Sequence, residues 1–146
     1  MPKEISAGAV VFRKEGGQPF YLLLHYPSGS RVKREYWDFP KGHIEKGETE
    51  IETVKREVQE ETGVKDLMLL NGFKETISYM FQAQGQKIFK TVVFFLGETR
   101  LKDVKISQEH LAYIWLPFDK ALLKLKFPNA KKLLKKANNL IFSLPQ

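Results

Sequence analysis

Three carboxylates recur at helical spacing near the middle of the chain and could hold a cation. They are Glu57, Glu60 and Glu61, within the segment EIETVKREVQEETGV. On an α-helix that advances about 100° per residue, Glu61 and Glu60 lie roughly 40° and 60° to either side of Glu57. The three side chains therefore share an arc of roughly 100°, where like charges repel by about 0.2–0.5 kcal/mol per pair.

Two interpretations of these carboxylates remain open on the helix alone. Hard divalent cations such as Mg²⁺ take oxygen ligands, and they combine a few carboxylates with water and substrate phosphates. Alternatively, the glutamates form a solvated acidic face on which Arg56 pairs with Glu60 and Glu52.

The loop before this helix favours phosphate chemistry. The segment GHIEKGET, which begins at Gly42, nearly matches the phosphate-binding loop G-x4-G-K-[ST], but Glu48 stands where the lysine belongs. A P-loop kinase is therefore excluded. A flexible loop that carries carboxylates toward a shared centre is instead typical of metal-mediated phosphate chemistry.

Local signals place both ends of the helix. Thr49-x-x-Glu52 forms a capping box at its start, and Gly63 can supply the left-handed cap at its end. Apolar residues recur in the sector beside the carboxylates, so we expect the acidic stripe to border the core instead of facing open water. The residues expected to be buried there are Ile51, Val54 and Val58.

The elements around this helix must position the rest of the site. Runs rich in β-branched and aromatic residues predict strands at residues 4–13, 20–25, 37–39, 67–82, 87–98 and 111–116. The first two strands should pair across a turn at residues 15–19, while residues 26–48 read mostly as a long functional loop. Proline starts two terminal helices, Pro117–Leu125 and Pro128–Asn138. This order predicts an α/β fold, a sandwich with a mixed β-sheet between helices.

The pattern from Gly42 to Val64 resembles the complete Nudix box. That box reads G-x5-E-x7-R-E-U-x-E-E-x-G-U, where U is aliphatic, and the segment meets all nine specified positions. So long a pattern is far more specific than a short motif. The resemblance implies an α/β/α sandwich of the Nudix type. It also implies hydrolysis of a nucleoside diphosphate linked to another group, with Mg²⁺, or alternatively Mn²⁺, as cofactor.

The same resemblance implies roles for individual residues. Arg56 and Glu48 would have a structural role, because their ion pair would tie the helix to the loop, and Gly63 would end the helix. The metal ligands that it implies are Glu57, Glu60 and Glu61, with the Gly42 carbonyl as an additional ligand.

Outside the box the sequence is similar to one branch of that family, the asymmetrical diadenosine tetraphosphate hydrolases. The shared motifs are Ser6-Ala7-Gly8-Ala9-Val10, Trp37-x-x-Pro40-Lys41-Gly42-His43, Lys90-Thr91-Val92 and Glu109-His110-x-Ala112-Tyr113-x-Trp115. Two departures, Tyr36 where relatives often have His and Phe39 where some have Pro, bear on phosphate and base contacts. Asymmetrical attack on a dinucleoside polyphosphate would release ATP and AMP.

Substrate contacts are expected around the metal site. If Gln84-Gly85 forms a two-residue hairpin turn, Tyr79 lies opposite Lys90, so that Tyr79 could stack on a base while Lys90 contacts a phosphate. The alternative is an ordinary cross-strand pair. Phe127 could form a second stacking wall, or it could pack in the core. The other substrate contacts that the resemblance implies are Lys41, His43 and His110.

A general base must activate the attacking water, and two carboxylates are candidates. Glu109, in the loop before the strand at 111–116, would act as base or as a further metal ligand, and Glu61 is the other candidate. Lys41 and Lys90 would stabilise charge on the polyphosphate. His25 has no catalytic partner in sight, so we expect it to be structural.

Composition excludes several classes of function. The chain has 146 residues and no cysteine, which excludes disulfide frameworks, thiolate metal sites and cysteine nucleophiles. One domain over residues 1–146 is expected, since domains usually run about 100–200 residues. The longest apolar run, residues 92–96, is far shorter than the roughly 20 residues that span a bilayer. We therefore expect a cytoplasmic monomer with no membrane partner.

Positive charge gathers near the C-terminal end. Residues 119–136 contain seven lysines and one acid, and so carry +6 of the net +7. Such a segment is either the solvated face of a docked helix or a surface that attracts a polyanion. Nucleic acid is thus a conceivable partner, but we do not favour it.

Three other functions compete with dinucleoside polyphosphate hydrolysis. An RNA 5′-end pyrophosphohydrolase would give the lysines a purpose, but such relatives tend to carry Gln and Gly where this chain has Lys41 and His43. A housecleaning pyrophosphatase of modified nucleoside triphosphates ranks third. A non-catalytic nucleotide-binding sensor ranks last, because every carboxylate of the box is intact.

Overall fold

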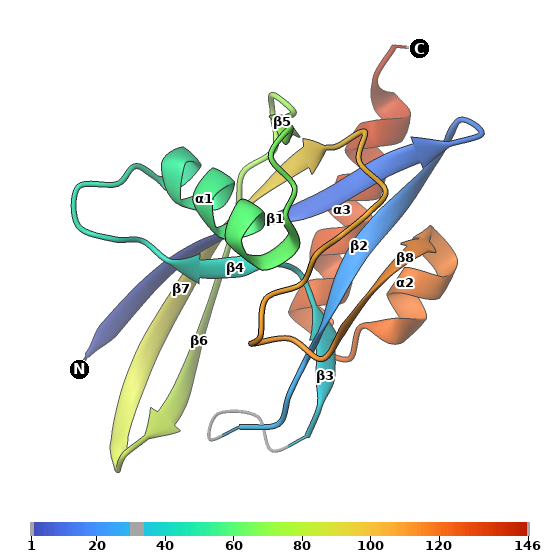
Figure 1. Ribbon diagram of the computed structural model, residues 1–146. Coiled ribbons are helices and arrows are strands. Elements are labelled where there is room, and N and C mark those ends of the chain that lie inside the picture. Colours follow the sequence, from blue (N-terminus) through green and yellow to red (C-terminus); the bar gives the residue numbers. More distant parts are fainter. Residues whose placement is uncertain (1, 30–33, 146) are drawn as a thin grey trace.

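In the part of the chain that the structure describes, residues 2–29 and 34–145, a mixed eight-stranded sheet lies between helices (Figure 1). This computed structural model has the strands β1 (Lys3–Glu15), β2 (Gln18–Tyr26), β3 (Tyr36–Asp38), β4 (Lys41–His43), β5 (Met68–Leu69), β6 (Glu75–Ala83), β7 (Gln86–Glu98) and β8 (Ala112–Pro117). The helices are α1 (Glu50–Thr62), α2 (Phe118–Lys124) and α3 (Pro128–Ser143). The order of elements follows the sequence prediction with two differences: β4 is an addition, and the strand predicted at residues 67–82 is divided into β5 and β6.

Two apolar layers hold the helices on opposite faces of the sheet. Alternate residues of β1 supply both layers, because successive side chains of a strand point to opposite faces. Ala9 and Val11 pack with Val54 and Val58 of α1. On the other face, Val10 and its sheet neighbours pack against α2 and α3. This arrangement confirms the predicted α/β/α sandwich.

One residue of the predicted buried face of α1 is wrongly assigned. Ile51 is 47% exposed, although Val54 and Val58 are fully buried as expected. Helical periodicity gives the direction of a side chain, but it does not say whether another element reaches the same turn. Ile51 lies in the first turn of α1, and it belongs to neither apolar cluster of the described residues.

The central strand β1 has different neighbours along its two halves. Phe12 to Glu15 pair with β2, whereas Ser6 to Gly8 pair antiparallel with β4. The segment 26–48, predicted mostly as a loop, therefore contains a strand at Lys41–His43 that the sequence did not predict. Within the same segment, residues 30–33 lie outside the described residues. This pairing is close: a Cβ at Gly8 would lie 2.5 Å from the carbonyl oxygen of Pro40.

The β6–β7 hairpin has the predicted two-residue turn. Ala83 pairs with Gln86, and both turn residues have positive φ, 51° at Gln84 and 75° at Gly85. Those signs are typical of the type I′ turn, whose twist matches that of paired strands. Figure 1 shows this hairpin extending away from the helices at the lower left. The predicted pairing of Tyr79 with Lys90 is confirmed.

The last helix is longer than predicted. Helix α3 starts at Pro128 as expected but continues to Ser143, five residues beyond the predicted end, because Ile141 adds another buried apolar residue. Among the described residues, no helix is long and apolar enough to cross a membrane.

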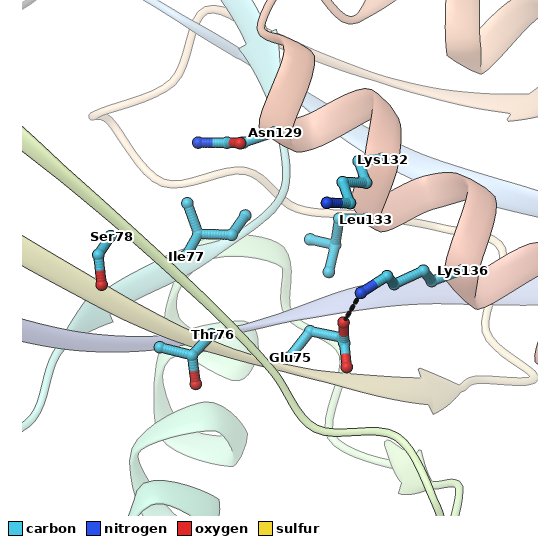
Figure 2. Close-up of a pocket in the computed structure, with 8 residues that line it drawn as sticks. All are labelled: Glu75, Thr76, Ile77, Ser78, Asn129, Lys132, Leu133 and Lys136. Atoms are coloured by element: carbon cyan, nitrogen blue, oxygen red, sulfur yellow. Dashed lines mark hydrogen bonds and ion pairs between the residues drawn. The ribbon is translucent and has the colours of Figure 1, made fainter.

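A small cavity of about 150 Å³ lies between α3 and β6 (Figure 2). Asn129, Lys132 and Lys136 face it from the helix, and Lys136 pairs with Glu75 at the start of β6. No residue that we predict for catalysis or binding lines this cavity.

Candidate active site

The helix that carries the three glutamates is capped at both ends by its own sequence. The Thr49 hydroxyl accepts a hydrogen bond from the Glu52 amide at 3.1 Å, and the Thr49 amide donates to the Glu52 carboxylate at 2.9 Å. At the other end Gly63 is left-handed, with φ 76°. The predicted capping box and glycine cap are both confirmed. Because Glu52 serves the cap, it is not the partner of Arg56 that a solvated acidic face would require.

Arg56 ties α1 to the preceding loop. Its Nε and Nη2 donate to the two oxygens of Glu48 at 2.6 and 2.9 Å, and Nη2 also donates to the His43 carbonyl at 3.1 Å. The predicted ion pair between helix and loop is therefore present. Hydrogen bonding to Arg56 lowers the pKa of Glu48 to about 2, so Glu48 stays ionised. Glu57 and Glu60 also accept from Arg56 Nη1, at 2.7 and 3.3 Å.

Gly42 is pressed against the Glu57 carboxylate. Its backbone is fixed by β4, where it pairs with Ala7 of β1. A Cβ at Gly42 would lie 2.0 Å from Cδ of Glu57, which no side chain can occupy. The loop glycine and the helix carboxylate that the sequence places 15 positions apart are thus in direct contact.

Glu57 and Glu61 form a pair of close, poorly solvated carboxylates. Burial and the neighbouring Glu61 raise the pKa of Glu57 to about 7, although Arg56 acts in the opposite direction. Glu61 is only 5% exposed, and its Oε1 makes no hydrogen bond of good geometry within the described chain. Two such carboxylates are most stable when a proton or a cation lies between them.

The donor set fits a hard cation, although no ready-made centre is present. No three Asp, Glu or His side chains of the described residues already surround one point. The buried Glu61 oxygen, the adjacent Glu57 carboxylate and the exposed Glu60 are nevertheless oxygen donors of the kind that Mg²⁺ takes. At present Arg56 occupies one oxygen of Glu57 and one of Glu60.

A cavity of about 750 Å³ opens over these carboxylates. The predicted residues that line it are Lys41, Gly42, His43, Glu57, Glu60, Glu61, Lys90 and Glu109. They come from β4, α1, β7 and the loop before β8, so the fold gathers them from four parts of the chain. The predicted substrate-binding residues outside this lining are Tyr79, His110 and Phe127, and the predicted structural residues Glu48, Arg56 and Gly63 are outside it as well.

Two lysines bring positive charge to the cavity. Lys90 is 3% exposed, and its Nζ lies 2.7 Å from the Ser6 hydroxyl and 3.3 Å from Glu4 Oε1. Lys41 lies 3.7 Å from Asp38 Oδ2. Burial lowers the pKa of Lys41, but the charge of Asp38 and other nearby acidic groups outweighs this and raises it, so Lys41 keeps its proton.

The two predicted stacking residues lie near the cavity but not in its wall. Tyr79, on β6, is 38% exposed. Phe127, at the start of α3, packs against Tyr36 in a T-shaped arrangement with 5.3 Å between the ring centroids. Tyr36 stacks on Tyr26 at 5.0 Å, and Tyr26 does line the cavity. Phe127 therefore joins a row of aromatic rings that reaches the cavity.

His110 lies behind the cavity. Its ring is 1% exposed and its Nε2 is 3.3 Å from Glu61 Oε1, so the ring touches a wall residue instead of open space. The direct substrate contact that we expected for His110 does not fit this position. His25, for which we expect a structural role, stacks on Trp37 with 4.4 Å between the ring centroids, and its Nε2 lies 3.3 Å from Glu35 Oε1.

Some cavity residues were not predicted from the sequence. They are Ser6, Tyr26, Glu45, Ser107 and Gln108. Ser6 belongs to a motif that the sequence offered, and Ser107 and Gln108 precede Glu109 directly. Tyr26 had no such signal, since it ends a strand whose place beside the site depends on sheet pairing.

Comparison with known proteins gives consistent similarities over nearly the whole chain. A family model described as NUDIX domain matches residues 2–137. The asymmetrical bis(5′-nucleosyl)-tetraphosphatase of Rattus norvegicus is 35% identical over 150 residues, which cover 96% of this chain and 97% of that protein. The corresponding protein of Mus musculus is 31% identical over 150 residues, with the same coverage.

A solved structure agrees with these sequence similarities. The binary complex of a C. elegans Ap4A hydrolase superposes with a TM-score of 0.82 and is 28% identical. The match covers 97% of this chain and 99% of that one.

Proposed function

This chain belongs to the Nudix family of hydrolases, and on that premise we propose that it hydrolyses dinucleoside polyphosphates, chiefly diadenosine tetraphosphate to ATP and AMP. The two curated relatives described above match over nearly their full length and are named asymmetrical bis(5′-nucleosyl)-tetraphosphatases, and the solved structure described above is named an Ap4A hydrolase. Support from the site itself comes from one observation: the box carboxylates and two cationic lysines line the same 750 Å³ cavity.

The charges in this cavity suit a polyphosphate chain that arrives with a divalent cation. Glu57, Glu60 and Glu61 would hold Mg²⁺ or Mn²⁺, with the Gly42 carbonyl as a further ligand. When bound, such a cation lowers the pKa of a coordinated water and neutralises phosphate charge. Without a cation, the fixed carboxylates would repel the negatively charged polyphosphate. The acidic wall can therefore accept this substrate only when a bound cation lies between them.

The chain's own residues supply orientation and charge. Lys90 is held by Ser6 and Glu4, so its ammonium reaches the cavity without being free to swing away. Lys41 is similarly held by Asp38. Both would bind phosphate oxygens and stabilise the negative charge that develops on the leaving polyphosphate. The proton of the attacking water would pass to a carboxylate in the wall, Glu109 or Glu61.

Product analysis tests this proposal directly. The protein with Mg²⁺ is incubated with diadenosine tetraphosphate and, in parallel, with triphosphorylated RNA and single nucleoside triphosphates, and the products are separated by ion-exchange chromatography. Equal amounts of ATP and AMP, formed faster than any product from the other substrates, are expected. Two ADP molecules, or faster release of pyrophosphate from RNA, would contradict the proposal.

Tyr79 tests the adenine contact separately from the chemistry. In Tyr79→Ala we expect KM for diadenosine tetraphosphate to rise about tenfold with little change in kcat, since stacking on a base is worth about 1–3 kcal/mol. Steady-state kinetics measures both constants. Phe81→Ala, on the same strand and 6.2 Å from the Tyr79 ring, is the control for disturbance of the hairpin. An unchanged KM in Tyr79→Ala would leave Tyr79 as an ordinary cross-strand neighbour of Lys90.

A further inference from the structure

The loop before β8 is bound to the end of α1 through its backbone. The Lys105 amide donates to the Thr62 carbonyl at 3.0 Å, and the Ser107 amide donates to the Glu61 carbonyl at 3.2 Å. These carbonyls belong to the last turn of α1, where helical partners are missing. The loop that carries Glu109 and His110 is therefore fixed relative to Glu61.

His110 is packed under Glu61. Its side chain is 1% exposed, and its ring lies nearly perpendicular to the Tyr26 ring, with 4.7 Å between the ring centroids. The Nε2 atom lies 3.3 Å from Glu61 Oε1, within ion-pair distance but outside good hydrogen-bond geometry. Since a buried carboxylate oxygen without a donor is costly, a small ring rotation that completes this bond is favourable.

Ser107 contacts the other nitrogen of the His110 ring, Nδ1. Its Oγ accepts a hydrogen bond from the Glu109 amide at 3.4 Å and lies 3.0 Å from His110 Nδ1. The hydroxyl proton of Ser107 remains available to donate to Nδ1. A neutral imidazole that accepts at Nδ1 carries its proton at Nε2, the atom that faces Glu61.

We propose that His110 is a positioning residue, which donates from Nε2 to Glu61 Oε1 and holds that carboxylate beside Glu57 in the orientation that binds a divalent cation. The inference rests on the proposed function in taking Glu61 as a metal ligand. Groups that hydrogen-bond to metal ligands in this way typically change metal affinity or activity by about 10–100-fold.

The tautomer gives a first test that needs neither metal nor substrate. The chain has three histidines, so long-range ¹H–¹⁵N correlation spectra can be assigned with single variants. At pH 8 we expect the His110 ring to carry its proton on Nε2. A ring protonated on Nδ1 would overturn the proposal, because Nε2 would then have nothing to donate to Glu61.

Metal binding gives a second test. The dissociation constant for Mn²⁺ is measured by calorimetry on folded protein without substrate. His110→Phe keeps a ring against Tyr26 but lacks the donor, and it should bind Mn²⁺ about tenfold more weakly. His110→Gln retains a donor near the Nε2 position and should stay within about threefold of the wild type. His25→Phe, outside the cavity, is the matched control and should bind as the wild type does.

The outcomes separate positioning from other roles. Wild-type Mn²⁺ affinity in folded His110→Phe, or equal weakening in the Phe and Gln variants, would overturn the proposal. If His110→Phe does not fold, Ser107→Ala tests the same chain of hydrogen bonds and should weaken Mn²⁺ binding several-fold; wild-type affinity in that variant would overturn it.

Kinetics distinguishes this inference from the proposed function. With diadenosine tetraphosphate we expect His110→Phe to lower kcat about tenfold and leave KM unchanged, because the ring does not line the cavity. A raised KM with unchanged Mn²⁺ affinity would instead restore direct substrate contact and refute positioning. If the wild type does not hydrolyse this substrate, the proposed function fails, while the tautomer and Mn²⁺ measurements still decide the role of His110.

Discussion

Replacing Glu57 with glutamine is expected to abolish turnover while the fold stays intact. Glutamine has nearly the same shape but no charge, so the variant loses a ligand for the cation on which phosphate attack depends. We expect kcat to fall by about a thousandfold or more, as when a key electrostatic group of an active site is removed. The melting temperature should not drop, because the change removes one charge from two carboxylates that already repel each other.

The Glu57 experiment has a matched control on the same helix. Glu50 is also on α1, but it pairs with Lys74 at 2.9 Å and is outside the cavity lining. Glu50→Gln should therefore retain wild-type kcat. Turnover and thermal unfolding are measured for both variants at saturating Mg²⁺. Near-normal activity in Glu57→Gln would remove Glu57 from the proposed metal site.

Adding a single methyl group at Gly42 is expected to be nearly as damaging. The new Cβ would lie 2.0 Å from Cδ of Glu57, and the pairing of β4 with β1 prevents the backbone from retreating. Either the carboxylate or the strand must shift, and a displacement of about 1 Å in an active site can cost about a hundredfold in rate. We expect Gly42→Ala to lose about a hundredfold in kcat. Overpacking should also cost about 1–3 kcal/mol of stability.

Another glycine controls for the substitution itself. A Cβ at Gly29 would meet no atom of the described residues within 4 Å, and its φ is not positive, so Gly29→Ala should leave activity and stability unchanged. Kinetics and chemical denaturation are compared for the two alanine variants. If Gly42→Ala matched Gly29→Ala in kcat and in the free energy of unfolding, the contact between Gly42 and Glu57 would not restrict the size of the side chain at position 42.

Local signals in the sequence were enough to place α1. The Thr49 capping box and the Gly63 cap involve residues a few positions apart, so they can be found without knowing the rest of the fold. Long-range contacts could not be found in this way. The strand at Lys41–His43 is three residues long and exists because β1 pairs with it. Ile51 has the right periodicity, but it stays exposed because neither apolar cluster of the described chain extends to it.

The candidate site was predictable to a different extent for different residues. The box carboxylates and Lys90 follow from spacing and from a two-residue turn, and the structure brings them to one cavity. The position of His110 behind Glu61 depends on how the loop before β8 attaches to α1, which no local pattern encodes. The same holds for Tyr26, which reaches the cavity only through sheet pairing.

The parallel pairing of β1 with β7 has a consequence for how the chain folds. Lys3 pairs with Phe89, and ten successive residues of β1 keep that separation of 86 positions. Bringing the ends of so long a loop together costs conformational entropy before the contacts between β1 and β7 can stabilise the fold. Folding should therefore be slow compared with that of helical proteins of similar length. During synthesis, β1 cannot pair with β7 until β7 has left the ribosome. Until then β1 can pair only with β2 and β4, which precede β7 in the sequence, and the edge of β1 that pairs with β7 stays open.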